Sequence, residues 1–452
     1  MRREFIRAIK SSLLIPLVGC AESEQPLRPN VILIMADDLG YGDISCYGGV
    51  AASTPNIDQM AKDGMMLTNY HSNGALSSPT RAALMTGKYQ QRTGVDGVIT
   101  AAKHREAGLA LDEVTIAERL SDLGYNCGMF GKWHLGYPSS LNPIYQGFDK
   151  FKGFVAGNVD YHSYVDEAGY YDLWNGGELD RTESGYIMDV ITQNSVEFIK
   201  HHDPKKTGEP FFLYVPYPSP HYPIQGRDDE PVRKEGKKRY IRKVAKEDVP
   251  RIYSEMIEVM DEGVGSILAT LSEMGLDENT MVIFCSDNGP AGSRGSTSGY
   301  RGAKGSMYEG GHRLPSVIRY PAVISAGQKS DVAILGMDLY PTFVEMAGGD
   351  ASSDKIDGVS MLSFLREGVE PQERDLFWGY RNRVAMLRGG WKMHRFPNAE
   401  SESEFDYELY NMIDDPFETT NLYDAEPKRA AAMMKAIELW VEDVNDGVKR
   451  IS

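Results

Sequence analysis

Four short apolar runs constrain the fold of this chain more than any other feature of its sequence. They are NVILIM at residues 30–35, YNCGMF at 125–130, PFFLYV at 210–215 and TMVIFC at 280–285. Each has the length and composition of a strand that is buried on both faces, and helical patterns separate the runs along the chain. This alternation predicts an α/β layered fold in which helices cover a large sheet.

The pattern changes after residue 350. Short aromatic runs, LFWGY at 376–380, VAMLRGGWKMH at 384–394 and FDYELYNM at 405–412, lie between turn residues. Such spacing is typical of antiparallel strands, so we expect a small antiparallel sheet that is closed by a terminal helix. The predicted units are a large α/β domain at 27–350 and a C-terminal subdomain at 351–452, with its final helix at about 426–449.

Size and charge narrow the possible classes of function. A chain of 452 residues with 41% hydrophobic content can bury one large core, or one large and one small core. Its formal net charge of -17 argues against a general nucleic-acid-binding role. The same charge means that an anionic substrate would need a local cluster of positive side chains.

The N-terminus has the features of an export signal. Four basic side chains precede an apolar run, which ends in LVGC at residues 17–20. LVGC resembles a bacterial lipobox, so we predict a signal peptide at residues 1–20 and lipidation of Cys20; an ordinary cleaved signal is the alternative. The mature chain would be periplasmic or an outer-membrane lipoprotein of a Gram-negative bacterium, and it would contact the membrane only through its lipid anchor.

Oxygen-bearing side chains follow the first and fourth apolar runs. Asp37 and Asp38 come after the first, and Asp287 and Asn288 come after the fourth. Because the carboxyl ends of parallel strands open into one crevice, we expect these pairs to converge although about 250 residues separate them. Three carboxylates and an amide oxygen suit a hard cation, calcium or magnesium. A turn or helix cap is the alternative for each pair alone.

Basic side chains follow the other two runs. Lys132 and His134 come after the second, and His221 lies in a proline-rich loop after the third. Lys304 lies among glycines, which let the backbone approach a ligand closely. Singly, each of these residues would usually be a hydrogen-bonded bystander. Around a common point, a metal and two lysines would neutralise a bound oxyanion.

The segment SSPTRAALMTG, which begins at Ser77, adds a candidate for the reacting group. Pro79 fits the first turn of a helix that Gly87 ends, so Ser77 would lie at a helix N-terminus, where free N–H groups favour anions. Capping of the helix by Ser77 or Ser78 is the alternative. Capping does not account for Arg81, whose guanidinium on the next turn would orient the group that Ser77 carries.

At these residues the chain resembles the formylglycine-dependent sulfatases of the alkaline phosphatase superfamily. Their signature is Cys or Ser, then x-Pro-x-Arg, a small residue, an apolar pair and Thr-Gly, and the segment matches it throughout. The resemblance runs from Pro29 to Leu422 and includes MADDLGYGD, GKWHLG, SDNG, RGAKGSMYEGG and ELYNMIDDPFETTNL. It implies a large mixed sheet between helices, as in alkaline phosphatase, and hydrolysis of sulfate esters.

The resemblance assigns the central role to Ser77. A sulfatase-maturing enzyme would oxidise it to formylglycine before export, and the hydrate would be the nucleophile. A sulfated serine would be a stable ester, whereas the free hydroxyl of a sulfated geminal diol can expel sulfate. Many family members carry Cys here, which leaves three alternatives: a native serine that is matured, an engineered replacement of Cys, or a catalytically silent protein that binds sulfated glycan.

The other roles follow by the same resemblance. Arg81 and Lys132 would stabilise the hydrate, and His134 would take its proton so that sulfate is ejected. His221 and Lys304 would contact the sulfate and the leaving oxygen, with His221 as general acid. The implied Ca2+ ligands are Asp37, Asp38, Ser77, Asp287 and Asn288.

A phosphomonoester or phosphonate hydrolase of the same superfamily is the competing enzyme class. A two-metal phosphatase needs a second set of His and Asp ligands, and this chain has lysines in the corresponding region.

Weaker features indicate the substrate. The chain resembles marine bacterial polysaccharide sulfatases, which implies a sulfated oligosaccharide or polysaccharide, and we predict a galactan such as iota-carrageenan. Residues 227–246 hold nine Lys or Arg against four acids. We expect this segment to border the site and to bind neighbouring sulfates, with the aromatic segment DYHSYVDEAGYYDLW at 160–174 offering faces for sugar rings. A solvated loop is the alternative.

Overall fold

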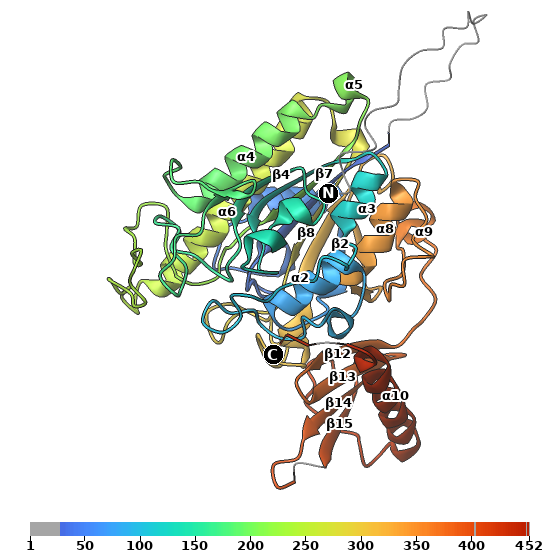
Figure 1. Ribbon diagram of the computed structural model, residues 1–452. Helices are drawn as coiled ribbons and strands as arrows, with labels where there is room; N and C mark the ends of the chain where they lie inside the picture. Colours follow the sequence, from blue (N-terminus) through green and yellow to red (C-terminus); the bar gives the residue numbers. More distant parts are fainter. Residues whose placement is uncertain (1–27, 402–403, 449, 452) are drawn as a thin grey trace, which may run out of the picture.

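The computed structural model describes residues 28–401, 404–448 and 450–451. The predicted signal peptide and lipobox at 1–20 lie outside the described residues. Two units are visible, a large one built around a mixed sheet and a small one at the C-terminal end (Figure 1). None of the described helices combines the length and the apolar composition that crossing a bilayer requires.

The large sheet contains eleven of the described strands in the order β10-β2-β9-β8-β1-β7-β3-β4-β5-β6, with β11 beside β2. Their bounds are β1 (Asn30–Ala36), β2 (Met65–His71), β3 (Asn126–Lys132), β4 (Lys150–Phe154), β5 (Trp174–Asn175), β6 (Glu178–Leu179), β7 (Phe211–Pro216), β8 (Thr280–Ser286), β9 (Arg313–Arg319), β10 (Gln328–Ser330) and β11 (Ile334–Leu335).

The four predicted apolar runs form four adjacent strands at the centre of this sheet, in the order β8-β1-β7-β3. Every residue of β1, β7 and β8 is buried. β1 pairs in parallel with β7 and β8, and β3 pairs in parallel with β7. The sheet is mixed because β9 runs antiparallel to both β8 and β2.

Helices cover both faces of the sheet. On one face α1 (Pro55–Lys62) and α4 (Ile187–His201) pack against the long helix α6 (Val249–Glu273), and on the other α2 (Ser77–Thr86) and α3 (Ile116–Asp122) pack against α8 (Leu339–Met346) (Figure 1). The remaining helices of this unit are α5 (Pro204–Thr207), α7 (Glu309–His312) and α9 (Leu362–Glu367). The apolar stripe of α6 is buried, as its period predicts.

The small unit is an antiparallel sheet with a helix against it. Its strands are β12 (Leu376–Tyr380), β13 (Arg383–Arg388), β14 (Trp391–Pro397) and β15 (Phe405–Asn411), in sequence order, and its helix is α10 (Pro427–Asn445). Trp378, Met393 and Ile437 lie in its core, which also includes Met307 and Met337 of the large unit. The small unit is therefore docked on the large one through apolar contacts. The domain limits at 350 and 351 stay a prediction. The helix α9 follows this limit in the chain, and it packs on the core of the large unit.

Candidate active site

The candidate site lies at the carboxyl edge of the central strands. Asp37 and Asp38 directly follow β1, Asp287 and Asn288 directly follow β8, and Lys132 ends β3. Each of these five side chains exposes 2% or less of its surface. Adjacent parallel strands thus bring together residues that are far apart in the sequence.

The backbone at Asp38 is strained. Asp38 has a φ of 64°, which is uncommon for a residue other than glycine. Its N–H donates to Asp287 Oδ1 at 3.1 Å, and its Oδ1 accepts from Asn288 Nδ2 at 2.7 Å. These bonds hold the ends of β1 and β8 together, and strained backbone of this kind is concentrated at functional sites.

Ser77 is the first residue of α2, whose ten residues are all buried. Its Oγ lies 3.1 Å from Asp37 Oδ1, 3.3 Å from Asn288 Oδ1 and 3.3 Å from Lys132 Nζ. Ser78 Oγ accepts from a backbone N–H of a neighbouring loop at 3.1 Å. Both serines therefore bond to groups outside the helix, and the alternative that they cap α2 is wrong.

Arg81 braces the site from the next turn of α2. Its Nε and Nη2 donate to Asp287 Oδ2 at 3.2 and 2.9 Å. Its Nη1 donates to the Lys132 carbonyl at 3.1 Å. The planar guanidinium therefore ties α2 to the ends of β8 and β3. The Arg81 side chain exposes only 1% of its surface.

Each lysine pairs with one carboxylate. Lys132 Nζ donates to Asp37 Oδ2 at 2.6 Å, and Lys304 Nζ donates to Asp38 Oδ1 at 2.5 Å. Burial lowers the pKa of Lys132, and Asp37 opposes that shift. Burial alone would also lower the pKa of Lys304, but the attraction of Asp38 and of the other carboxylates raises it.

The oxygen atoms of the site fit a hard divalent cation. Asp38 Oδ2 is buried and has no hydrogen-bond partner among the described residues. Asn288 donates through Nδ2 to Asp38 and to the Gly289 carbonyl, which leaves its Oδ1 towards Ser77. Asp37, Asp38 and His221 also offer ligand atoms within 4.8 Å of one another. Carboxylate and amide oxygens are the ligands that calcium and magnesium prefer.

The site is balanced in charge without a metal. Its three carboxylates are matched by three basic side chains; the pairs are Asp287 with Arg81, Asp37 with Lys132 and Asp38 with Lys304. A divalent cation would make the site net positive. A positive site is what an anionic ligand requires in a chain whose net charge is -17.

His134 is held as a neutral base. Its Nε2 donates to the Ile99 carbonyl at 2.9 Å, and its Nδ1 is buried with no partner in the described part of the chain. Burial, followed by the positive charges of Lys132 and Arg81, keeps the pKa of His134 well below its usual range. The Nδ1 lone pair is therefore free to accept a proton.

His221 has the opposite arrangement. Its Nδ1 donates to the Tyr222 carbonyl at 2.7 Å, and its Nε2 lies 3.7 Å from Asp38 Oδ2. Burial lowers the pKa of His221 to about 3, although the charge of Asp38 acts to raise it. His221 thus faces the same carboxylate as Lys304, with Nε2 as the atom that can exchange a proton.

Family models match nearly the whole described chain. A model described as Sulfatase matches residues 29–349, and one described as N-sulphoglucosamine sulphohydrolase, C-terminal, matches residues 302–444.

The chain belongs to the sulfatase family.

Relatives and solved structures agree with this assignment. N-acetylgalactosamine-6-sulfatase of Mus musculus is 30% identical over 421 residues, which cover 87% of this chain and 77% of that protein. Arylsulfatase A of Homo sapiens is 31% identical over 467 residues, covering 91% and 86%. The crystal structure of Ps i-CgsB in complex with k-i-k-neocarrahexaose has a TM-score of 0.81 at 27% identity and covers 94% of this chain and 95% of that chain.

These findings confirm the predicted family, the fold class and the enzyme class. This sulfatase is a hydrolase of sulfate esters, built on a mixed α/β sheet with a smaller antiparallel sheet. The roles of single residues stay predictions, which the geometry above makes specific.

Sequence reasoning missed the roles of two residues that hold the sulfatase site. A Cβ at Gly157 would lie 2.6 Å from His134 Nε2, so only glycine leaves room for that ring. Tyr161 Oη lies 2.6 Å from the Pro218 carbonyl and 2.9 Å from that of His221, so its hydroxyl braces the histidine loop. A lone glycine and a tyrosine carry no motif, and their role is visible only in three dimensions.

The aromatic segment at 160–174 was predicted to offer ring faces to sugars, and only part of it can do so. Tyr161 exposes 1% and Tyr164 exposes 2% of its surface, so their rings offer no face to a sugar. Their hydroxyls bond to backbone carbonyls of neighbouring loops, which satisfies the polar end of each buried ring. Tyr170 is 54% exposed and remains a candidate.

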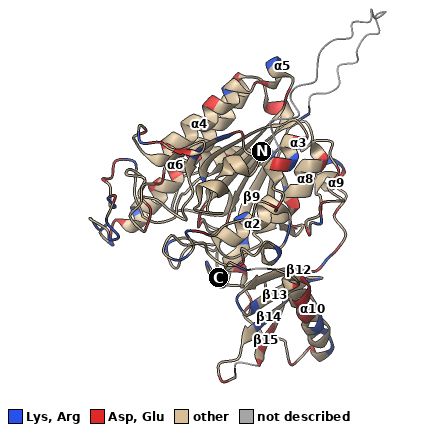
Figure 2. Ribbon diagram, in the orientation of Figure 1, with Lys and Arg blue, Asp and Glu red and all other residues tan. Residues whose placement is uncertain are grey.

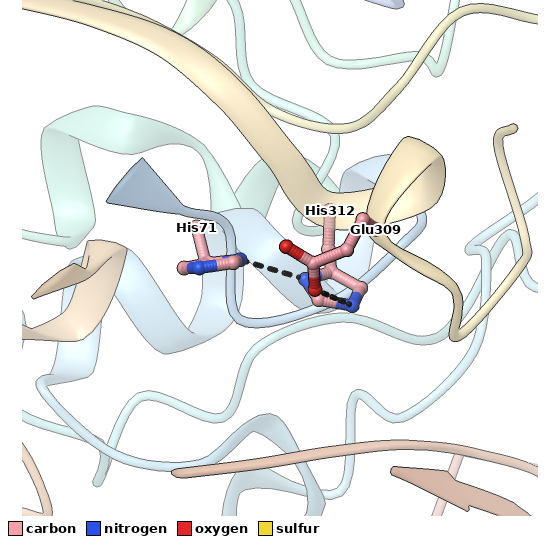
Figure 3. A group of neighbouring side chains, drawn as sticks. All are labelled: His71, Glu309 and His312. Atoms are coloured by element: carbon pink, nitrogen blue, oxygen red, sulfur yellow. Dashed lines mark hydrogen bonds and ion pairs between the residues drawn. The ribbon is translucent and has the colours of Figure 1, made fainter. Parts of the chain in front are cut away.

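A second group of potential metal ligands lies at the junction with the small sheet (Figure 3). His71, Glu309 and His312 are buried, and the two rings face each other with their Nδ1 atoms 3.0 Å apart. The Asn69 amide donates to a backbone carbonyl, so its Oδ1 accepts from His71 Nε2 at 2.8 Å. His71 Nδ1 is therefore an acceptor, and the shared proton belongs to His312 Nδ1.

Lys392 fills the position that a cation would take in this group. Its Nζ lies 2.6 Å from Glu309 Oε1, 3.0 Å from Glu418 Oε1 and 3.1 Å from His312 Nε2. The Met307 carbonyl lies 3.0 Å from the same ring nitrogen. If His312 carried its proton on Nε2, that N–H could donate to the Met307 carbonyl. The lone pairs of His71 Nδ1 and His312 Nδ1 would then face each other, and the His312 N–H would face the Lys392 ammonium. We therefore interpret the group as a lysine-centred network.

Proposed function

We propose that this sulfatase removes sulfate from a sulfated glycan through a formylglycine hydrate formed at Ser77. The observation that carries the proposal is the position of Ser77 Oγ at the start of α2, within 3.3 Å of Asp37, Asn288 and Lys132. A helix N-terminus and a lysine favour an anion at this point. A serine that only capped α2 would bond to a backbone N–H of its own helix, whereas these partners lie at the ends of three separate strands.

Maturation precedes the reaction. A radical-type maturing enzyme would remove two hydrogens from Ser77 before export, and water would add to the aldehyde to give a geminal diol. One diol oxygen attacks the sulfur, and the bond between sulfur and the glycan oxygen breaks. Lys132 and Arg81 stabilise the negative charge of the attacking oxygen.

Two histidines complete the cycle. His221 delivers a proton from Nε2 to the departing glycan oxygen, because the negative charge of a bound sulfate raises the pKa of this imidazole. His134 Nδ1 then accepts the proton of the remaining diol hydroxyl, the bond between carbon and the sulfate oxygen breaks, and the aldehyde forms again. Lys304 binds the sulfate and the leaving oxygen.

The proposed cofactor is Ca2+, held by the oxygens of Asp37, Asp38, Asp287 and Asn288 and by the oxidised Ser77. Bound there, it would supply positive charge beside the sulfate oxygens. The unpartnered Asp38 Oδ2 and the convergence of ligand atoms from Asp37 and Asp38 support a divalent cation.

We propose a sulfated galactan, iota-carrageenan, as the substrate. The similarity to Ps i-CgsB, which was solved with k-i-k-neocarrahexaose, supports this choice. Export, with a lipid anchor at Cys20, would place the enzyme in the periplasm or at the outer membrane, where it would contact such polymers.

Two measurements test the proposal. Mass spectrometry of the peptide that carries Ser77, from enzyme made in its native host, should show a residue lighter by two hydrogens, or its hydrate. Sulfate release should be highest from iota-carrageenan oligosaccharides, in comparison with chondroitin, heparan and ulvan oligosaccharides. Ser77→Ala is the inactive control. Unmodified serine together with no turnover of any sulfate ester would contradict the mechanism, and a better rate on chondroitin or heparan would contradict the substrate.

A further inference from the structure

The loop between β7 and α6 forms a basic cavity beside the active site. The cavity has a volume of about 620 Å³. Its lining has one carboxylate, Glu167, and five cations, which are Arg233, Lys237, Lys238, Arg239 and Lys243. Figure 2 shows this loop at the left of the view, with Lys and Arg along it.

The cations of the cavity lack acidic partners. Across the described residues, none of the five has a carboxylate oxygen within 4.0 Å, whereas the neighbouring Arg227 and Arg242 do. Arg242 pairs with Glu230, and Glu235 pairs with Arg181. Two acids of the loop, Glu230 and Glu235, are thus paired with cations outside the cavity, and the cavity keeps its positive charge in a chain whose net charge is -17. Such an arrangement attracts an anionic ligand.

Tyr222 joins this cavity to the catalytic groups. It lines the cavity, follows His221 in the chain and stacks on that ring with the centroids 4.3 Å apart. Lys304 exposes 20% of its side chain and His221 exposes 6%, whereas Lys132 exposes none. The catalytic site is therefore open on the side where Lys304 and His221 lie.

A second cavity, of about 930 Å³, extends the first. The two share Glu167 and Lys238 in their linings. The second adds Lys103, and it adds Tyr170 with the Arg105 guanidinium 3.8 Å from the ring centroid. We call the two cavities together the basic groove.

We propose that the basic groove binds the sulfated sugar units next to the one that loses its sulfate. This inference rests on the proposed function, and it makes the preferred substrate a chain with several sulfates. Sulfates on neighbouring units pair with Lys237, Lys238 and Arg239, and the ring of Tyr170, which is 54% exposed, offers a sugar the face that Arg105 does not cover. Linked contacts of this kind raise the affinity for a chain far above that for one sulfated unit.

Binding measurements test the groove directly. The variant K237Q/K238Q/R239Q removes three of its charges, and K200Q/K428Q/K435Q removes three exposed charges from α4 and α10 as the matched control. Calorimetry would compare an iota-carrageenan hexasaccharide with its desulfated counterpart at low and high salt. We expect about tenfold weaker binding of the sulfated chain by the groove variant, with a flatter salt dependence, and wild-type binding by the control.

Kinetics separate the groove from the catalytic site. The groove variant should lower kcat/KM for the sulfated hexasaccharide far more than for 4-nitrophenyl sulfate, which is too small to reach the groove. Equal affinity of the groove variant and the control for polysulfated chains would overturn the inference. The inference would also be overturned if the wild-type enzyme bound single-stranded DNA of the same charge as tightly as it binds the sulfated chain. If wild-type enzyme binds the sulfated chain through the groove but releases no sulfate, the proposed function fails and the groove stands.

Discussion

The two histidines of the active site are opposite tautomers. A backbone carbonyl accepts from Nε2 of His134 and from Nδ1 of His221. The free lone pair is therefore on Nδ1 in the first residue and on Nε2 in the second. Burial keeps both rings neutral at neutral pH, because it depresses both pKa values. Each ring therefore gains the ability to carry a proton only when the negative charge of a bound sulfate is near, on Nδ1 in His134 and on Nε2 in His221.

This asymmetry predicts different responses to mutation. His221→Ala should lower the rate on sugar sulfates by about 10²- to 10⁴-fold, since their leaving oxygen needs a proton. The loss on an aryl sulfate with a good leaving group should be much smaller. His134→Ala is the comparison, because sulfate ejection is common to both substrates, and it should slow both alike. Equal losses on both substrates for His221→Ala would refute the general-acid role.

Asp287 tests the metal site. It accepts from Arg81 and from the Asp38 N–H, and it is fully buried. Asp287→Ala should remove bound calcium and activity together, and Asp287→Asn, which keeps the shape, should weaken both. Metal analysis of the purified variants would check this, with thermal unfolding as the control for folding. Calcium at full occupancy in Asp287→Ala would show that the proposed ligand set is wrong.

At the scale of elements, β2 and α7 each bury a histidine beside the small sheet. Burial lowers the pKa of His71 to about 3, from an ordinary value of 6.5. As the pH falls through 6.5, the unfolded chain gains a proton at this residue and the folded chain does not. The folded state therefore loses stability as the pH falls from 6.5 to about 3. At pH 5, protonation of His71 in the unfolded chain lowers the free energy of unfolding by roughly 2 kcal/mol relative to its value above pH 6.5.

His71→Gln should flatten this dependence. Between pH 7 and pH 5 the free energy of unfolding should fall by less in the variant than in wild type, because glutamine does not titrate. Urea unfolding at pH 5, 6 and 7 measures both slopes. His201→Gln, at an exposed position on α4, is a suitable control that should leave the slope unchanged. Parallel slopes for His71→Gln and wild type would contradict the buried neutral state of His71.

At the scale of the whole molecule, Lys392 links the two units. It lies on β14 of the small sheet, and its ammonium bonds to Glu309 on α7 of the large unit. Arg301 donates to the Glu418 carbonyl across the same junction. The segment between Arg301 and Glu309 includes Lys304, so the small sheet supports a segment that reaches the active site.

Lys392→Met should destabilise the enzyme by about 3–5 kcal/mol, because it removes the buried ammonium that pairs with both Glu309 and Glu418. Lys435→Met, on the exposed face of α10, should have little effect. Adding Glu309→Gln to Lys392→Met should restore part of the loss, since it removes one of the two buried carboxylate charges that Lys392 balanced. Denaturant unfolding would measure all three, and a wild-type stability for Lys392→Met would contradict the network.

The sequence predicted much of the architecture. Apolar runs of strand length predicted the four central strands, since a strand buried on both faces requires apolar residues throughout. The resemblance to sulfatases, carried by an ordered set of motifs, predicted the family and enzyme class. The turn after each run marked Asp37, Lys132, His221 and Asp287, because parallel strands present their carboxyl ends at one edge.

Other properties were decided by the tertiary structure alone. Sequence spacing cannot tell which histidine nitrogen is free, because each tautomer depends on a carbonyl from a distant loop, Ile99 for His134. It cannot place Gly157 against that ring, or choose Lys392 over a metal, because both depend on distances between segments far apart in the chain. The sequence by itself determined the strands, the motifs and the family; the packing of distant segments decided protonation, charge pairing and the basic groove.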